Sequence, residues 1–176
     1  YFASWIFNLL VVVIPLHAKR RRMKNWLAGR YLAFKDDLVC VYLSAINTSY
    51  DSDLIESLRN PKVFSDYFSE RYSTDQNRWH AVHNALYEQG LSDIRFHCRV
   101  FLSEYDLVVG LVGDLDSALM YRYGHVRSML LKTELAQPEY DSIKSLLNML
   151  YPIHCPWSFL DGKIHQDFIM DGIKSI

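Results

Sequence analysis

Apolar side chains recur with a helical period along most of the chain. From residue 27 onwards they are spaced three or four positions apart, which places them on one face of a helix. The first such series is Leu27, Tyr31, Phe34, Leu38, Val41 and Ala45. No turn-forming cluster separates this series from the apolar segment before it, so the pattern predicts one helix that leaves that segment and enters the core near Ile46.

The later part of the sequence predicts further helices joined by short loops. Residues 47–53 form the first loop by composition, because Asn, Thr, Ser and Asp cluster there. Helices are then expected over residues 53–58, 62–70, 75–119, 139–150 and 162–173, with a break at Gly90. No run alternates with period two, so the sequence predicts an all-α fold with five to seven helices in an irregular bundle.

An apolar run without Asp, Glu, Lys or Arg fills the first 18 residues. As a helix it would span roughly 25 Å, slightly less than a hydrocarbon core of about 30 Å. Five cations follow it within six positions: Lys19, Arg20, Arg21, Arg22 and Lys24. A cleaved signal peptide carries its cations before the apolar core, and a buried core helix would leave these cations unexplained. We therefore expect an N-terminal transmembrane helix over residues 1–18, with the remainder of the chain cytoplasmic.

Three residues of this run have expected roles in membrane anchoring. Trp5 lies towards the outer end, where amphipathic aromatic rings favour the interface, and Pro15 lies near the inner end. Asn8 would either hydrogen-bond to another membrane helix or be tolerated in a thin or distorted bilayer. Because the chain begins with Tyr1 rather than Met, we expect residues 1–18 to be the last helix of a longer membrane region, through which the chain could form a homo-oligomer.

Charge divides the chain at the basic run. The whole sequence of 176 residues has a formal net charge of -1, although the five cations after residue 18 alone contribute +5. The remainder is therefore acidic and makes a poor nucleic-acid binder, since such binding depends on neutralising phosphates. The division predicts a basic juxtamembrane and connecting helix over residues 19–47, which fixes topology and contacts anionic lipids, and a cytoplasmic helical domain over residues 48–176.

One pair of residues suggests catalysis. Arg78 is followed by His83 in a predicted helix, a spacing that resembles the RNase motif of the all-helical HEPN domains. In that family the Arg and His act on the scissile phosphate and its 2′-hydroxyl, so the resemblance implies a membrane-anchored RNase that uses Arg78 and His83. The sequence departs from the family pattern at Trp79, where a small polar residue is usual.

No other pattern predicts catalysis, a metal or a cofactor. His80 and His83 are three apart on a helix, but no ordered third and fourth ligand accompanies them. Cys40, Cys98 and Cys155 are far apart in the sequence, and no CxxC motif occurs. This arrangement is typical of thiols that stay reduced in a cytoplasm.

A set of residues outside the clear apolar stripes predicts a contact with a protein partner. The segment from Tyr151 to Trp157 contains two prolines and is expected to be irregular. Tyr and Trp are enriched at protein interfaces. The expected partner-binding residues are Tyr121, Tyr123, Tyr151, His154 and Trp157.

The layout of residues 1–24 and the helical pattern after them resembles a loose group of small bacterial membrane proteins. These have one or two transmembrane helices, a basic juxtamembrane run and a helical cytoplasmic domain. Some are effectors of anti-phage systems, including those associated with retrons. The resemblance implies a non-enzymatic toxic effector in the bacterial inner membrane, which a protein partner holds inactive. The alternatives are the RNase described above and a structural subunit of a membrane complex.

Overall fold

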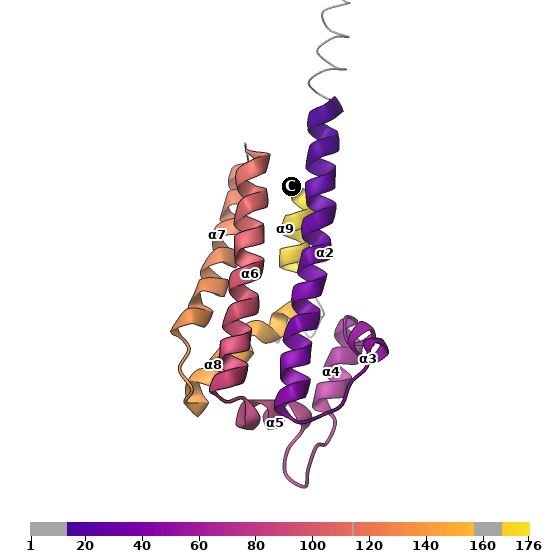
Figure 1. The fold of residues 1–176 in the computed structure, drawn as a ribbon, viewed down its shortest axis with the longest axis vertical. Helices are drawn as coiled ribbons and strands as arrows, with labels where there is room; N and C mark the ends of the chain where they lie inside the picture. Colours follow the sequence, from indigo (N-terminus) through magenta and orange to yellow (C-terminus); the bar gives the residue numbers. More distant parts are fainter. Residues whose placement is uncertain (1–13, 114, 157–166) are drawn as a thin grey trace, which may run out of the picture.

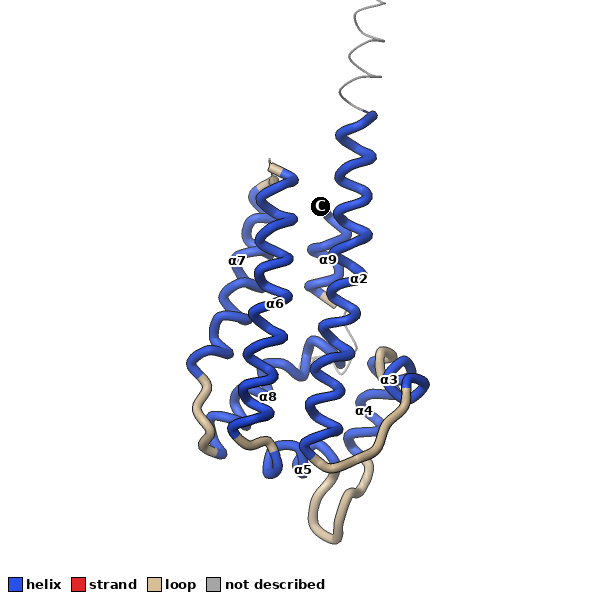
Figure 2. Tube along the Cα trace, viewed as in Figure 1, coloured by secondary structure: helices blue, strands red, loops and turns tan. Residues whose placement is uncertain are grey.

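The computed structural model describes residues 14–113, 115–156 and 167–176, and over these residues it is helical without a β-strand (Figures 1 and 2). The all-α prediction is therefore confirmed. The elements in chain order are α2 (Ile14–Ala45), α3 (Ser52–Ser57), α4 (Pro61–Ser69), α5 (Arg78–Ala85), α6 (Glu88–Val112), α7 (Ser117–Lys132), the 3-10 turn η2 (Thr133–Leu135), α8 (Tyr140–His154) and α9 (Phe168–Ser175).

The longest of these helices, α2, joins two different environments. Its 32 residues run without interruption from the end of the apolar segment into the centre of the bundle. The upper part of α2 stands above the other helices, while Leu27, Tyr31 and Leu38 in its lower part are fully buried (Figure 1). The prediction of one continuous helix is thus confirmed for residues 14–45, whereas the expected entry into the core near Ile46 is wrong, because α2 is already buried at Leu27 and ends at Ala45.

The core forms where α2 packs against α6 in antiparallel orientation. The rings of Phe34 and Phe101 stack with their centroids 4.8 Å apart. At the edge of this contact the Nε atom of Arg30 lies 2.8 Å from the Glu104 carboxylate. The short helix α9 adds Ile169 and Ile173 to the same core and contacts both α2 and α7.

Several helix boundaries differ from the prediction because local caps decide them. The helix expected over residues 75–119 is wrong at its start, since residues 71–77 form a loop and Asn77 caps α5 by accepting from the N–H of His80. Capping of this kind satisfies an N–H group that has no partner within the helix. Likewise the helix expected over residues 53–58 begins at Ser52, because Asp51 caps α3 by accepting from the N–H of Leu54.

The expected break at Gly90 is also wrong, because Gly90 lies inside α6. The chain breaks earlier, at Leu86 and Tyr87, and α6 continues to Val112. A Cβ atom on Gly90 would lie 2.6 Å from the Leu86 Cδ1 atom. The glycine therefore allows the buried Leu86 side chain to approach the first turn of α6, and it does not end a helix. The later break falls at Gly113, whose φ of 79° is a conformation that glycine adopts without strain.

The predicted membrane segment lies mainly outside the described residues. Trp5 and Asn8 belong to residues 1–13, and Trp157 belongs to residues 157–166, which are likewise not described. Pro15 lies in the first turn of the described part of α2. Among the described residues, no helix combines the length and the apolar character needed to cross a membrane.

Candidate functional site

The five cations of the basic run surround one stretch of α2, and we call them the cationic collar: Lys19, Arg20, Arg21, Arg22 and Lys24. Since successive helical residues are rotated by about 100°, five cations in six positions point to all sides of the helix. None of them forms an ion pair with a carboxylate among the described residues. The Nζ atom of Lys24 instead donates to the Lys174 carbonyl at 2.6 Å, which brings the end of α9 to the level of the collar.

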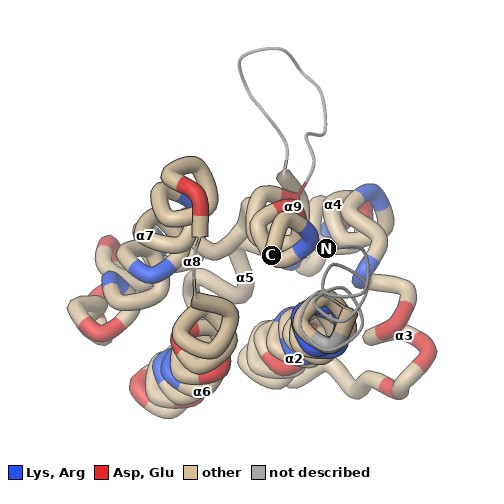
Figure 3. Tube along the Cα trace, turned by 90° about the horizontal axis from the view of Figure 1, so that it is seen from above, with Lys and Arg blue, Asp and Glu red and all other residues tan. Residues whose placement is uncertain are grey.

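Beside the collar, α2 and the end of α9 enclose an open pocket of about 540 Å³. Its lining consists of His17, Arg20, Arg21, Lys24, Asn25 and Ile176. Guanidinium and ammonium groups donate several hydrogen bonds and accept none, so this surface favours an anion such as a phosphate group. Figure 3, seen from above, shows Lys and Arg positions on α2 with α9 beside it.

The two residues of the predicted RNase site do not form one exposed constellation. Arg78 and His83 are five residues apart on α5, which places them about 140° apart around the helix. The Arg78 guanidinium donates to the Tyr67 carbonyl, pairs with Glu70 and lies 4.2 Å from the Tyr67 ring centroid. His83 is buried on the opposite side. A general base must reach a proton of the substrate, and the buried imidazole does not offer that access.

These contacts give Arg78 a structural role that can be measured. Arg78→Ala should lower the free energy of unfolding by about 1–2 kcal/mol, because hydrogen bonds from a charged group and a cation–π contact are lost. Urea denaturation of both proteins would measure the change. RNA cleavage by the purified chain that disappears in both Arg78→Ala and His83→Ala would instead support the RNase hypothesis.

An aromatic cluster joins α2, α4, α5 and α8. It consists of the buried Tyr42, Phe64, Phe68, His83 and His154 and the partly buried Trp79 and Tyr151. The His154 imidazole stacks on the Phe64 ring at 4.7 Å, with 9° between the planes. Tyr42 meets the same imidazole edge to face at 5.6 Å. His154 therefore packs in the core as an aromatic side chain.

Both buried histidines lack hydrogen-bond partners among the described residues, at both ring nitrogens. Burial is the main cause that lowers the pKa of His83 to about 4, with smaller contributions from His80 and Lys144. Burial, reinforced by the charge of Lys35, also lowers the pKa of His154 well below its ordinary value. Both imidazoles are consequently neutral at pH 7.

The five expected partner-binding residues fall into different environments. Tyr121 is 78% exposed and remains a candidate for contact with another molecule. Tyr123 donates from its hydroxyl to Asp106 at 2.7 Å, and Tyr151 packs in the aromatic cluster. The expectation of an irregular segment is wrong for Tyr151 and His154, because they lie in the last turn of α8, and His154 is 1% exposed. Trp157 lies outside the described residues.

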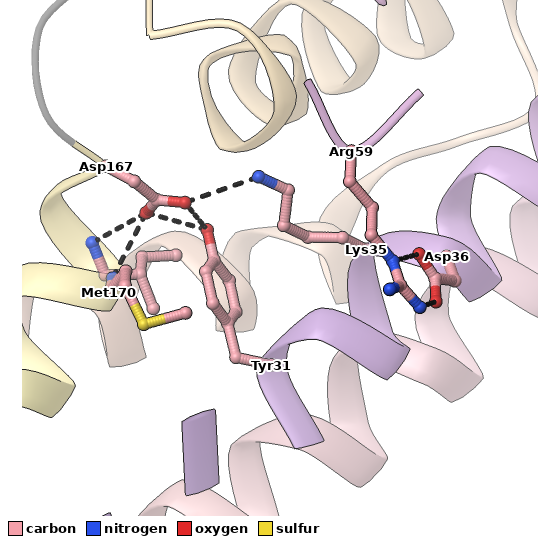
Figure 4. A network of polar contacts seen from close by, with 7 residues as sticks. Tyr31, Lys35, Asp36, Arg59, Asp167 and Met170 are labelled. Carbon is pink, nitrogen blue, oxygen red and sulfur yellow. Dashed lines mark hydrogen bonds and ion pairs between the residues drawn. The ribbon is translucent and has the colours of Figure 1, made fainter. Parts of the chain in front are cut away.

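The structure also shows a polar network that the sequence analysis missed (Figure 4). Asp167 caps α9 through the N–H groups of Ile169 and Met170, at 3.2 and 3.1 Å. The same carboxylate accepts the Tyr31 hydroxyl at 2.8 Å and lies 3.4 Å from the Lys35 Nζ atom. Burial raises the pKa of Tyr31 well above its ordinary value, so the hydroxyl stays protonated and donates. One feature of the sequence pointed to this network. Lys35 is a charged residue within the apolar stripe of α2, and a buried charge needs a partner.

A second pocket of about 440 Å³ lies between the lower end of α2 and the start of α6. The His97 Nδ1 atom lies 3.1 Å from the Asp37 carboxylate at its wall. Within the described ranges, no group of three His, Cys, Asp or Glu side chains is placed to hold a metal ion.

The described residues define an all-helical bundle around one long helix that carries a cationic collar above the core. No family model, curated protein or solved structure matches the chain.

Proposed function

We propose that this protein is a membrane-tethered, non-enzymatic interaction protein of the bacterial inner membrane. In this proposal it acts as a toxic effector of an anti-phage defence complex, and a protein partner holds it inactive. Residues 1–18 anchor it, the cationic collar contacts anionic lipids, and the helical domain faces the cytoplasm.

The continuity of α2 is the observation that carries the proposal. One helix extends from the apolar segment through the cationic collar to the centre of the bundle. A helix held by core contacts along its lower half transmits a displacement along its axis, because packed interiors deform little. A change in the bundle, such as release of a partner, would therefore reach the anchor without an intervening flexible linker.

Substituting the collar tests the tether and its sidedness. Replacing all five collar residues with Gln should reduce, several-fold, the fraction of membrane-bound chain whose helical domain is cytoplasmic, because cations near a membrane helix set its orientation. The full chain would be expressed in bacteria, membranes isolated, and the domain located by its protection from protease in intact spheroplasts.

A matched control removes five exposed cations elsewhere: Lys62, Arg122, Arg127, Lys132 and Lys144. This variant has the same net charge as the collar variant and should keep the wild-type orientation. Recovery of the wild-type chain in the supernatant after membranes are pelleted would contradict the tether.

The effector role requires a separate measurement. Expression of the chain without its partner should depolarise the inner membrane, as reported by a potential-sensitive dye, and co-expression of the partner identified by affinity purification should prevent it. A membrane potential that is the same in both cases would contradict the effector role and favour a structural subunit of a membrane complex.

A further inference from the structure

The pocket of about 440 Å³ at the lower end of the bundle lies between facing stripes of α2 and α6, whose lower ends stand side by side above α5 (Figure 1). On each helix the lining residues recur at steps of three and four, so they share one face. They are Asp37, Cys40, Val41 and Ser44 on α2, and Gly90, Asp93 and His97 on α6. The link between α5 and α6 adds Leu86 and Tyr87. We call this cavity the acidic pocket.

The acidic pocket holds two carboxylates that no cationic side chain neutralises. The neighbouring Asp36 carboxylate is paired with Arg59 at 2.6 Å and does not line the pocket. Asp93 accepts from the Gln89 amide at 2.9 Å. In the described part of the chain, neither Asp37 nor Asp93 pairs with a Lys or an Arg. Among the described residues that line the pocket, none is Lys or Arg. The pocket therefore favours a positively charged group.

Apolar side chains form much of the remaining wall. Val41 and Leu86 are buried, and Ala45 and Ala85 are partly buried. Pockets that bind small molecules have volumes of about 300–1,000 Å³ and apolar walls with a few polar groups that orient the ligand. The acidic pocket agrees with this description in its volume and in its lining. It is therefore suited to a ligand with one charged group and an apolar body.

We propose that the acidic pocket binds a small organic monocation, a primary amine carried on a short apolar body. The ammonium group has three N–H donors and no acceptor, so it donates to the Asp37 and Asp93 carboxylates. The neutral His97 imidazole that donates from Nδ1 to Asp37 has an acceptor at Nε2. The apolar body lies against Val41 and Leu86. Binding of such an amine does not depend on the membrane tether.

Other classes of ligand fit the acidic pocket less well. A neutral or anionic ligand would remove the two carboxylates from water without supplying a counter-charge, which costs free energy. A metal ion needs more ligands, and within the described ranges no group of three His, Cys, Asp or Glu side chains is placed to hold one. A lysine of a protein partner could meet the same carboxylates, but its unbranched stem would fill little of a pocket of about 440 Å³.

The thiol of Cys40 allows occupancy of the pocket to be measured. Cys40 lines the pocket and is partly exposed, whereas Cys98 and Cys155 are buried. The full chain in a nonionic detergent would be treated with 4,4′-dithiodipyridine, an uncharged thiol reagent. Because burial raises the pKa of the Cys40 thiol, the reaction would be followed at about pH 8.5, where more thiolate forms. We expect 2-phenylethylamine to slow the modification several-fold with saturation, and the uncharged 2-phenylethanol to leave it unchanged.

Two variants test the role of the carboxylates. Asp37→Asn and Asp93→Asn should each raise the half-saturating concentration of 2-phenylethylamine about tenfold, because each removes one charged acceptor. Asp66→Asn is the matched control, since it removes the same charge from an exposed position of α4 outside the lining, and it should bind the amine like wild type. Each chain would be measured with and without the amine, because Asp37 also affects the Cys40 thiol. Cys40→Ser gives the background rate, and circular dichroism would confirm that the helices are retained.

Three results would overturn the proposal. The first is the absence of any slowing by 2-phenylethylamine at millimolar concentration. The second is equal slowing by the amine and the alcohol, or an unchanged half-saturating concentration in both Asp37→Asn and Asp93→Asn. The third is slowing by N-acetyl-lysine amide without slowing by 2-phenylethylamine, which would assign the pocket to a lysine of a protein partner. Because no lipid enters the experiment, each of these results would leave the proposed tether intact.

Discussion

Between pH 7.5 and pH 5, the chain should lose about 4 kcal/mol of its free energy of unfolding through His83 and His154. Above the ordinary histidine pKa of about 6.5, both imidazoles are neutral in both states and contribute no pH dependence. As the pH falls below that value, the unfolded chain binds two protons that the folded chain does not bind. The loss continues until the folded pKa is reached, which for His83 is about 4.

His83 and His154 should be the only histidines that cause this loss of stability. His83→Phe and His154→Phe should each remove about half of the pH dependence, because an aromatic ring remains but no group titrates. His125→Asn is the control, since His125 is exposed. Urea denaturation at pH 7.5, 6 and 5 would give the free energies. An unchanged pH dependence in the double variant would show that carboxylates, rather than these histidines, cause the loss.

The same two histidines show why a local pattern did not predict the aromatic cluster. Pro152 suggested an irregular segment after Leu150, yet it lies on the exposed side of the last turn of α8. His154 then reaches α4, where it stacks on Phe64, 90 positions earlier in the chain. Such contacts depend on how the helices pack and leave no periodic signal.

Helices with a strong apolar stripe were predicted well, whereas their ends were not. The series from Leu27 to Val41 is buried in α2, and Ile143 to Leu150 form the core side of α8 as expected. Burial of one face determines the existence of such a helix, and this periodicity can be read from the sequence. The break before α6 falls instead at Leu86 and Tyr87, where Leu86 is buried, and no local sequence signal marks that packing.

In the candidate site, features that depend on neighbouring residues could be predicted, whereas features that depend on residues far apart in the sequence could not. The collar could be read directly, because its five cations are nearly consecutive and charged side chains are seldom fully buried. The RNase pair also relied on local spacing, but burial of His83 depends on how α5 packs against the other helices. Lys35 was the missed signal: a charged residue inside an apolar stripe needs a partner. Its partner, Asp167, is 132 positions away.

Removing that partner should have the second large effect, because Asp167 holds α9 to α2. Asp167→Ala should lower the free energy of unfolding by about 3 kcal/mol. It removes the cap of α9 and the Tyr31 hydrogen bond, and it leaves Lys35 without a counter-ion at 8% side-chain exposure. Asp167→Asn should cost less, since its amide oxygen still accepts from the Tyr31 hydroxyl and from the N–H groups of α9.

A double variant separates the unpaired charge from the lost hydrogen bonds. Lys35→Met, added to Asp167→Ala, should restore part of the stability, because the buried ammonium no longer needs a partner. Urea denaturation would give the energies, and amide hydrogen exchange over residues 168–175 would report detachment of α9. Equal stability of Asp167→Ala and wild type would contradict the role of the network. A strictly additive loss in the double variant would show that the ion pair contributes nothing. Since α9 braces the part of α2 just below the collar, its detachment would loosen the link between the bundle and the proposed anchor.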